Sequence, residues 1–269
     1  MMQTSFSAKS ALRAQQQQLD VIANNIANVN TVGFKSSSVN FKDTLYNTMT
    51  RPTDGVGLER GTGVRVSSIN KSFALGTPMQ TGVPLDFCLT KDGFFTLQDQ
   101  DGNALYTRNG AFALSVEGGS RYLVDSEGRY VQGQSGKIQV PEGDMSTLSI
   151  NEKGELFIKQ ATASNTTGGT TGGTAAGAPA TFATLKISSF LNNEGLEAAG
   201  SSTFRATTAS GEAKALENPE VRVGYLESSN VDMATEMTTL IRAQKAFSFA
   251  SQAVRTADEM AAMANNMRT

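Results

Sequence analysis

Few side chains of this protein are of the kinds that most enzymes use for chemistry. The 269 residues include no histidine, which removes the most common general base and the most common transition-metal ligand. The single cysteine, Cys88, excludes an intrachain disulfide and a thiolate metal cluster. Its apolar neighbours, in the segment Leu85-Asp86-Phe87-Cys88-Leu89, favour an inert buried thiol over a nucleophile, because reactive thiols occupy accessible, electropositive sites.

Two glycine-containing patterns partly match known binding loops. Asp99-Gln100-Asp101-Gly102-Asn103 resembles the start of a calcium loop, but an EF-hand needs glycine at position six and glutamate at position twelve. Ala104 and Gly110 stand there, so a hairpin turn is favoured over a calcium site. The glycines of 55–57 and 61–63 lack the strand–turn–helix context of a dinucleotide site. The sequence therefore predicts no catalytic, cofactor or metal site, and no enzyme.

Composition excludes further classes of protein. Charged residues make up 18% of the chain and the formal net charge is −2, with no cluster of Lys and Arg. Nucleic-acid binding needs a concentrated basic face, so it is not expected. No apolar run approaches the roughly 18 residues of a membrane span. The first residues also lack a basic segment followed by an apolar stretch, so a cleaved Sec signal is not expected.

The two ends of the chain resemble each other and differ from the middle. Residues 4–29 and 226–267 have helical patterning and contain neither proline nor glycine. All six prolines fall between Pro52 and Pro219, and 25 of the 26 glycines lie between Gly55 and Gly224. This layout predicts terminal helices around a glycine-rich β body, which is an organisation suited to assembly.

The first helix has an apolar seam of about three heptads. Leu12, Leu19 and Ile26 are seven residues apart, and Ile22 and Val29 lie three residues after the last two. Thr4 or Ser5 can cap the start of the helix. The C-terminal stop is supplied by Asn28, Asn30 and Gly33.

The last helix has a more regular seam. A seven-residue step relates Met233, Leu240, Phe247, Val254 and Ala261, and small residues follow three positions later at Ala243, Ala250, Ala257 and Ala264. Asn230 or Asp232 can cap the helix, and Glu236 in its first turns favours the helix dipole. One interpretation is a helix folded back on its own domain. Because both ends carry a seam, we favour helices that pair as a coiled coil, within or between subunits.

The middle of the chain has the pattern of an antiparallel β domain. Turn dipeptides such as Asp92-Gly93 and Asn109-Gly110 recur between short apolar or alternating runs, as in hairpins. A Thr/Gly-rich stretch near 161–180 predicts a flexible loop. The chain is thus predicted to be α+β, with a helix and turn in 1–45, a β-rich outer domain in 46–225 and a helix in 226–269.

Specific motifs at both ends resemble those of bacterial flagellar rod and hook proteins. The N-terminal segment Ala23–Lys35 is similar to the signature of that family, a helix that ends in an Asn-rich turn closing on Gly-Phe-Lys. Its residues are Asn24, Asn25, Asn28, Asn30, Gly33, Phe34 and Lys35. The C-terminal signature is matched by Gly224, Tyr225, Leu226, Glu227, Ser229, Asn230 and Val231.

The resemblance extends through the middle of the chain. Asp92-Gly93-Phe94-Phe95 and Tyr106–Phe112 look like the β domain of the family, and Phe41–Tyr46 is most similar to its distal rod members. Phe87-Cys88 departs from the pattern, since the family tends to have small aliphatic residues there. The Thr/Gly-rich stretch is read as an insertion.

The resemblance implies a structural subunit that self-assembles into a hollow helical tube, transmits torque and passes exported subunits. It implies partnership with other rod and hook subunits and with the flagellar type III export apparatus. It also implies a place in the basal body, reached without a cleaved signal peptide. The terminal seams would be the assembly surfaces. The alternatives are a proximal rod or short hook protein and, outside the family, a secreted β-domain adhesin.

Overall fold

A computed structural model describes residues 2–50, 57–99, 101–141, 148–151, 154–158, 180–216 and 218–267. They form two compact units. The helical unit comprises the described parts of 1–29, 36–72 and 231–269, and the β unit comprises those of 30–35 and 73–230. The predicted boundary at residue 45 therefore falls inside a hairpin of the helical unit. The Thr/Gly-rich stretch lies almost wholly outside the described residues.

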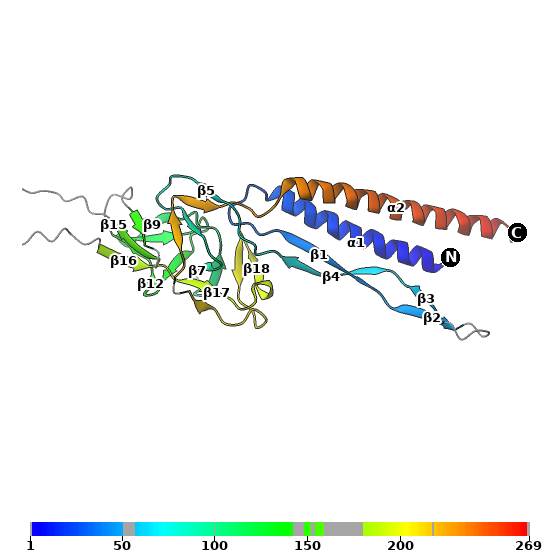
Figure 1. The fold of residues 1–269 in the computed structure, drawn as a ribbon, viewed down its shortest axis with the longest axis horizontal. Helices are drawn as coiled ribbons and strands as arrows, with labels where there is room; N and C mark the ends of the chain where they lie inside the picture. The colour runs from blue at the N-terminus through cyan, green and yellow to red at the C-terminus, as the bar shows by residue number, and fades with distance from the viewer. Residues whose placement is uncertain are drawn as a thin grey trace, which may run out of the picture. The chain divides into compact units, whose positions relative to one another are not determined.

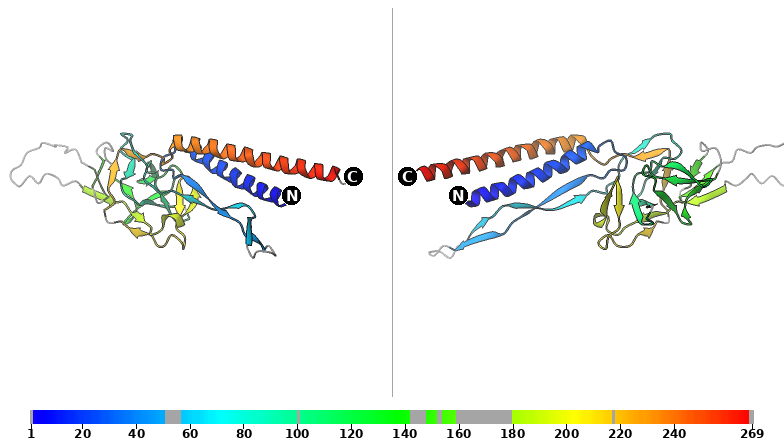
Figure 2. Two further views of the ribbon diagram at one scale, coloured as in Figure 1. Left: turned by 45° about the vertical axis from the view of Figure 1, so that its right-hand side comes forward. Right: turned by 180° about the vertical axis from the view of Figure 1, so that it is seen from behind.

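The helical unit contains two long helices and a hairpin. Helices α1 (Met2–Ala27) and α2 (Met233–Asn266) lie side by side and run in opposite directions, with the N-terminus of α1 and the C-terminus of α2 at the same end (Figures 1 and 2). Strand β1 (Ser37–Asp43) pairs antiparallel with β4 (Val64–Lys71). Strand β2 (Tyr46–Thr50) pairs antiparallel with β3 (Gly57–Gly61). The α1 helix lies between α2 and the β1–β4 ribbon (Figures 1 and 2).

Local chemistry explains where the helices begin and end. Asp232, one of the two predicted caps, accepts a hydrogen bond at Oδ1 from the backbone N–H of Ala234 at 3.1 Å, so α2 begins at Met233. Residues 226–232, which the pattern placed with the helix, instead precede it and include the end of strand β22 (Tyr225–Glu227). The reason is that β22 pairs with β5 (Pro78–Gln80). No helix in the described part of the chain has both the length and the apolarity needed to cross a membrane.

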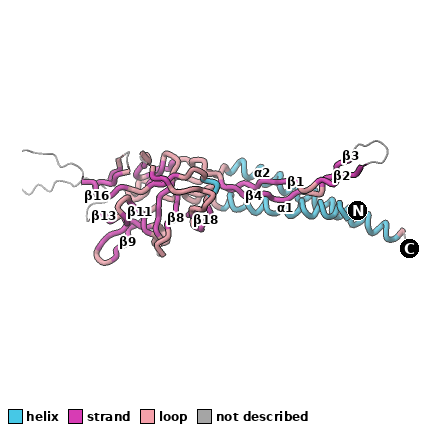
Figure 3. The backbone as a smooth tube through the Cα atoms, turned by 90° about the horizontal axis from the view of Figure 1, so that it is seen from below, coloured by secondary structure: helices cyan, strands magenta, loops and turns pink. Residues whose placement is uncertain are grey.

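The β unit is antiparallel throughout its described strand pairs, as predicted. Its largest sheet has the order β13-β10-β11-β7-β8-β19-β18, with β9 on β10, β12 on β11, β17 on β7 and β20 on β17. Figure 3 shows these strands gathered around short loops. The strands are β7 (Phe94–Gln98), β8 (Ala104–Thr107), β9 (Ala113–Glu117), β10 (Ser120–Val124), β11 (Tyr130–Gly133), β12 (Gly136–Lys137), β13 (Gln139–Val140), β17 (Ile187–Ser189), β18 (Glu197–Gly200), β19 (Thr203–Arg205) and β20 (Lys214–Ala215).

Smaller sheets and one short helix complete this unit. Strands β14 (Leu148–Ile150), β15 (Glu155–Ile158) and β16 (Ala180–Thr184) form a three-stranded sheet, and β6 (Phe87–Leu89) pairs with β21 (Val221–Val223). The 3-10 helix η2 spans Asn193–Gly195. The predicted hairpin turn at 99–103 is confirmed, because it joins the paired strands β7 and β8 and the Asp99 N–H donates to the Asn103 carbonyl at 3.0 Å.

Two apolar clusters fill the β unit. The larger is aliphatic with three phenylalanines, and it includes Phe95, Leu97, Leu123 and Leu156, all at most 2% exposed. The smaller is aromatic and is built on Phe94, Tyr106, Phe190 and Phe204. The Tyr106 and Phe190 rings meet edge to face, with centroids 4.8 Å apart. Cys88 is 1% exposed, as predicted, and burial raises the pKa of its thiol, so this thiol is not poised for reaction.

Candidate assembly site

The two terminal signatures meet inside the β unit. The Gly33 N–H donates to the Glu227 carbonyl at 2.8 Å. Gly33 has a φ of +66°, and a Cβ there would lie 2.7 Å from the backbone nitrogen of Asn109. Only glycine meets both demands without strain. The turn that ends the N-terminal signature is therefore held against the middle motif and the C-terminal signature together.

Three charged side chains from these motifs form what we call the ion cluster: Lys35, Arg108 and Glu227. The Lys35 Nζ lies 2.6 Å from Glu227 Oε1, and the Arg108 Nη1 lies 3.0 Å from Glu227 Oε2. The three side chains are at most 2% exposed. One carboxylate thus binds two cations that come from distant parts of the sequence.

Backbone groups complete the ion cluster. The Gly76 N–H donates to Glu227 Oε1 at 2.8 Å, and Lys35 Nζ donates to the Ala74 carbonyl at 2.7 Å. Arg108 Nη2 donates to the Lys91 carbonyl at 3.1 Å. Because every charged group has several partners, the cost of removing these charges from water is offset by strong hydrogen bonds.

Burial dominates the electrostatics of Lys35. It lowers the pKa of the ammonium, and the neighbouring Glu227 carboxylate opposes this by attraction and hydrogen bonding. The Arg108 guanidinium also lies 5.7 Å from the centre of the Phe94 ring, which provides a cation–π contact. The exposed Asp92 carboxylate lies 3.7 Å from Arg108 Nη2 and adds a second negative charge beside the two cations. The Lys35, Arg108 and Glu227 side chains themselves are buried, so the cluster joins chain segments and has no exposed group to act on a substrate.

Sequence reasoning identified Lys35 and Glu227 as signature residues but missed that they bind each other. Arg108 was noted only as part of the middle motif. The signal that could have linked them is that each is the one charged residue of its motif, in 23–35, 106–112 and 224–231. Buried charges occur in pairs, so such residues are candidates for mutual pairing.

In the helical unit, one signature residue joins three elements. Asn25 is 1% exposed. Its Nδ2 donates to the Ser37 carbonyl of β1 at 2.8 Å and to Glu236 Oε1 of α2 at 2.9 Å, while its Oδ1 accepts from the Ser37 N–H at 2.9 Å. An amide is suited to this position because it both donates and accepts. Asn25 therefore fixes α1 against α2 and the hairpin.

The remaining signature residues have local roles or intermediate exposure. Asn28 Nδ2 donates to Asn24 Oδ1 at 2.7 Å and to the Asn24 carbonyl at 2.9 Å, which satisfies a carbonyl at the end of α1. Leu226 and Val231 are buried. Asn24 and Asn30 are exposed, and intermediate exposure is shared by Phe34, Gly224, Tyr225, Ser229 and Asn230.

Four residues of the N-terminal seam lie on covered parts of α1, whereas the fifth, Val29, lies after the helix ends at Ala27. Ile22 is 4% exposed, and Leu12, Leu19, Ile26 and Val29 are partly buried. The α1 helix has neighbours on two sides, α2 and the β1–β4 ribbon (Figures 1 and 2). Ala14, outside the predicted seam, is also buried at 2% exposure. A single seam therefore describes only part of the contact surface of α1.

The C-terminal seam divides into covered and exposed residues. Ala243 is buried at 3% exposure, and Leu240, Ala250 and Val254 are partly buried. Met233 and Phe247 are 41% and 37% exposed. Other large apolar side chains of α2 are also exposed, namely Met237, Ile241, Phe249, Met260, Met263 and Met267. The structure of one chain thus leaves a wide apolar surface on α2 in contact with solvent.

Comparison with known families matches three parts of the chain. Residues 7–35 match the model of the flagella basal body rod protein family. Residues 89–158 match the D1 domain of flagellar hook protein FlgE/F/G, and residues 222–267 match the C-terminal region of the flagellar basal body rod FlgEFG proteins. The first and last of these matches contain the two signatures that meet at Glu227.

Individual proteins are similar along the whole chain. The flagellar basal-body rod protein FlgG of Borreliella burgdorferi is 34% identical over 100% of this chain and 99% of its own length. The protein of the same name from Caulobacter vibrioides is 33% identical over 100% of both. The flagellar hook protein FlgE of Salmonella typhimurium is 41% identical, but over only 48% of this chain and 29% of its own length.

Proposed function

The chain belongs to the flagellar basal-body rod protein family, and we propose that it forms the distal part of the rod. It is a structural subunit of the flagellar rod in the basal body, and not an enzyme. The observation that supports the distal position is the full-length similarity to FlgG rod proteins, in contrast to the partial match to a hook protein. The resemblance of Phe41–Tyr46 to distal rod members supports the same assignment.

We propose that the chain self-assembles into a hollow helical tube that transmits torque and passes exported subunits. Its partners would be further copies of itself and the neighbouring rod and hook subunits. The support is the number of large apolar side chains that the helical unit leaves exposed, since exposed apolar patches often mark interaction surfaces. In the tube, α1 and α2 would pair as a coiled coil, within and between copies.

The assembly surfaces in this proposal are the two predicted seams. Leu12, Leu19, Ile22 and Ile26 belong to α1 and Val29 follows its end, while Met233, Leu240, Ala243, Phe247, Ala250 and Val254 belong to α2. The exposed Met233 and Phe247 would be covered by a neighbouring copy. The terminal segments 1–45 and 226–269 would form the inner layer, and 46–225 would contain the outer domain with its Thr/Gly-rich loop.

Delivery of the subunit is also part of the proposal. The chain would leave the cell through the flagellar type III export apparatus without a cleaved signal peptide, and would function outside the cytoplasm. Family membership is the support for this route. A short hook or proximal rod protein is the second candidate, and the 130-residue match to a hook protein at 41% identity favours a relationship with the hook.

Electron microscopy of basal bodies tests the assignment. An in-frame deletion of the gene should leave a rod that ends early and carries no hook, and cells should lose motility. A plasmid copy of the gene should restore both. A deletion strain with a rod of normal length but no hook would favour a hook protein, and one with intact basal bodies would refute the rod function.

A further inference from the structure

The methionines of this protein lie in places that are unusual for this residue type. Methionine is among the residues most often buried in folded proteins. Among the methionines whose side chains the structure describes, by contrast, all are at least 41% exposed. One of them is Met79 of β5, and the other five belong to α2 or to the residue that caps its end: Met233, Met237, Met260, Met263 and Met267.

The end of α2 brings three of these side chains together. Met260, Met263 and Met267 are spaced by three and four residues, so they fall on one face of the helix. They are 48%, 57% and 84% exposed, whereas Ala257, one turn earlier, is buried. The last turns of α2 extend beyond the start of α1, its neighbour in the helical unit (Figures 1 and 2). The sulfur-bearing face of this segment is therefore in contact with solvent in a single chain.

An exposed thioether can undergo a reaction with peroxides that aliphatic side chains do not undergo. The O–O bond of hydrogen peroxide breaks, and one oxygen atom forms a bond to the methionine sulfur. The other oxygen leaves as water with both hydrogens, so the sulfur is oxidised by two electrons and the peroxide is reduced. The product, methionine sulfoxide, is polar where the thioether was apolar, and it disrupts surfaces that are rich in methionine.

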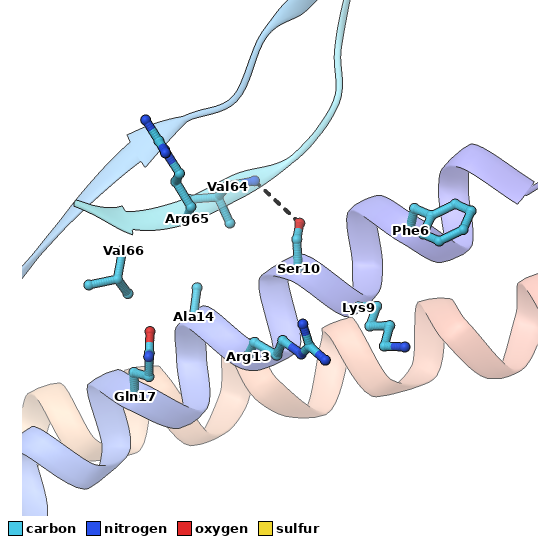
Figure 4. Close-up of a pocket in the computed structure, with 9 residues that line it drawn as sticks. All are labelled: Phe6, Lys9, Ser10, Arg13, Ala14, Gln17, Val64, Arg65 and Val66. Atoms are coloured by element: carbon cyan, nitrogen blue, oxygen red, sulfur yellow. Dashed lines mark hydrogen bonds between the residues drawn. The ribbon is translucent and has the colours of Figure 1, made fainter.

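The groove between α1 and β4 is another exposed apolar surface of the helical unit, and it differs from α2 in this respect (Figure 4). Phe6, Val64 and Val66 line it, and Phe6 is 67% exposed. The described residues that line the groove include no methionine. Peroxide at low concentration therefore leaves this surface unchanged, and within these two surfaces the oxidation is confined to α2.

We propose that the five methionines of α2 are a peroxide-sensitive modification site, and that their oxidation in the unassembled chain prevents its incorporation into the rod. The proposal rests on the proposed function, because the polarity of α2 matters only if a neighbour covers this helix. Burial of a polar sulfoxide without a hydrogen-bond partner is unfavourable. The fold of the single chain is spared, because the reacting side chains are exposed and belong to neither apolar cluster of the β unit.

Mass spectrometry of the purified full-length chain tests the first part of the proposal. After treatment with hydrogen peroxide, peptides from α2 should each gain one oxygen atom per methionine, at rates similar to that of the exposed Met79. Helix content measured by circular dichroism should not change. Oxidation of Met79 without oxidation of the α2 methionines would overturn the proposal.

A competition inside one cell tests the effect on assembly. In a strain that lacks the gene, the native chain is expressed together with a variant that has leucine at the five positions (M233L, M237L, M260L, M263L and M267L). Leucine is similar in volume and shape and has no sulfur to oxidise. Under peroxide, the variant should be enriched about tenfold over the native chain in basal bodies, relative to the whole-cell ratio. Without peroxide the two should be incorporated equally.

The matched control is Met79→Leu, which removes an exposed methionine of the β unit and leaves α2 native. Competed in the same way, it should show no enrichment under peroxide. Because both chains of each pair share one cell, general damage by peroxide affects them equally. Enrichment of Met79→Leu equal to that of the fivefold variant would overturn the assignment of the effect to α2.

The native chain alone provides a measurement that does not depend on the leucine variant. In peroxide-treated cells, the fraction of α2 methionine present as sulfoxide should be about tenfold lower in basal bodies than in the whole-cell pool. Equal fractions, or equal incorporation of native and variant chains under peroxide, would overturn the modification site and leave the rod function intact. A native chain that is absent from basal bodies without peroxide would instead refute the rod function itself.

Discussion

The two units of this protein differ in how far their apolar and charged side chains are buried within one chain. The β unit buries two apolar clusters and also pairs three buried charged side chains with one another. Among the described residues of the helical unit, the buried apolar side chains are only Ala14, Ile22, Val231, Ala243 and Ala257. Most exposed large apolar residues lie in that unit, from Phe6 and Phe41 to the methionines of α2. The β unit thus covers most of its apolar and charged groups within one chain, whereas the helical unit leaves many large apolar side chains exposed.

The strongest test of this difference is to remove the charge at the centre of the ion cluster. Glu227→Gln keeps the size of the side chain but leaves Lys35 without a counter-charge, and leaves Arg108 with only the exposed Asp92 carboxylate, 3.7 Å from its Nη2. Breaking a buried ion pair costs about 3–5 kcal/mol. The β unit should lose this much stability in urea unfolding of the full chain, followed by tyrosine fluorescence.

An exposed ion pair of the same unit provides the control. Lys91 Nζ lies 2.5 Å from Glu220 Oε1, with side chains 48% and 46% exposed. Lys91→Ala should cost less than about 1 kcal/mol, because water screens the pair. Equal losses for Glu227→Gln and Lys91→Ala would show that the ion cluster contributes nothing special to the β unit.

The second test places a charge on the seam of the helical unit. Leu240 is partly buried on α2, and Leu240→Asp introduces a carboxylate there at a cost of roughly 1–3 kcal/mol. The tyrosine transition of the β unit should be unchanged, while incorporation into basal bodies and motility should fail. Arg242→Ala, an exposed neighbour off the seam, should have little effect. Normal incorporation of Leu240→Asp would contradict a role for the seam in assembly.

The smallest expected effect concerns the start of α2. The pKa of Asp232 is lowered, mainly by the hydrogen bond from Thr235 Oγ1 at 2.6 Å and then by the N–H of Ala234. A carboxyl with a lower pKa in the folded state stabilises the helix above its unfolded pKa. This stabilisation is lost as the pH falls through the folded value.

A pH titration of helix content by circular dichroism measures this loss. Asp232→Asn keeps a capping side chain that does not titrate. The difference between the native and Asp232→Asn profiles should therefore appear only in the acid range and should be small. Superimposable profiles at all pH values would show that the Asp232 cap makes no titrating contribution.

The elements with local signals could be predicted from the sequence. The two helices, the antiparallel strands, the Asp232 cap and the buried Cys88 all follow from patterns within a few residues. The ion cluster could not be predicted in this way, because Lys35 and Glu227 are 192 positions apart. The residues next to each of them do not indicate which charged group it pairs with. Nor could the grouping of β1 and β4 with the helices, because strand alternation does not indicate which surface a ribbon covers.

The heptad pattern of α2 is informative but incomplete. Seven residues turn a straight α-helix by about 20° less than two full turns, so a series with this step drifts around the helix. This drift does not explain why Met233 and Phe247 are more exposed than Ala243, because Leu240, between them in the same series, is partly buried. The buried residues of α2 are Ala243 and Ala257, which belong to the alanine series three positions after the seven-residue series.

The ion cluster also sets an order of events in folding. Two of its members, Lys35 and Arg108, precede Glu227 by 192 and 119 positions, so the last group to arrive closes the longest loops. Until residue 227 is available, burial of the two cations is unfavourable and long-range contacts of this kind form slowly. A copy truncated before residue 227 would therefore lack the carboxylate with which both buried cations pair.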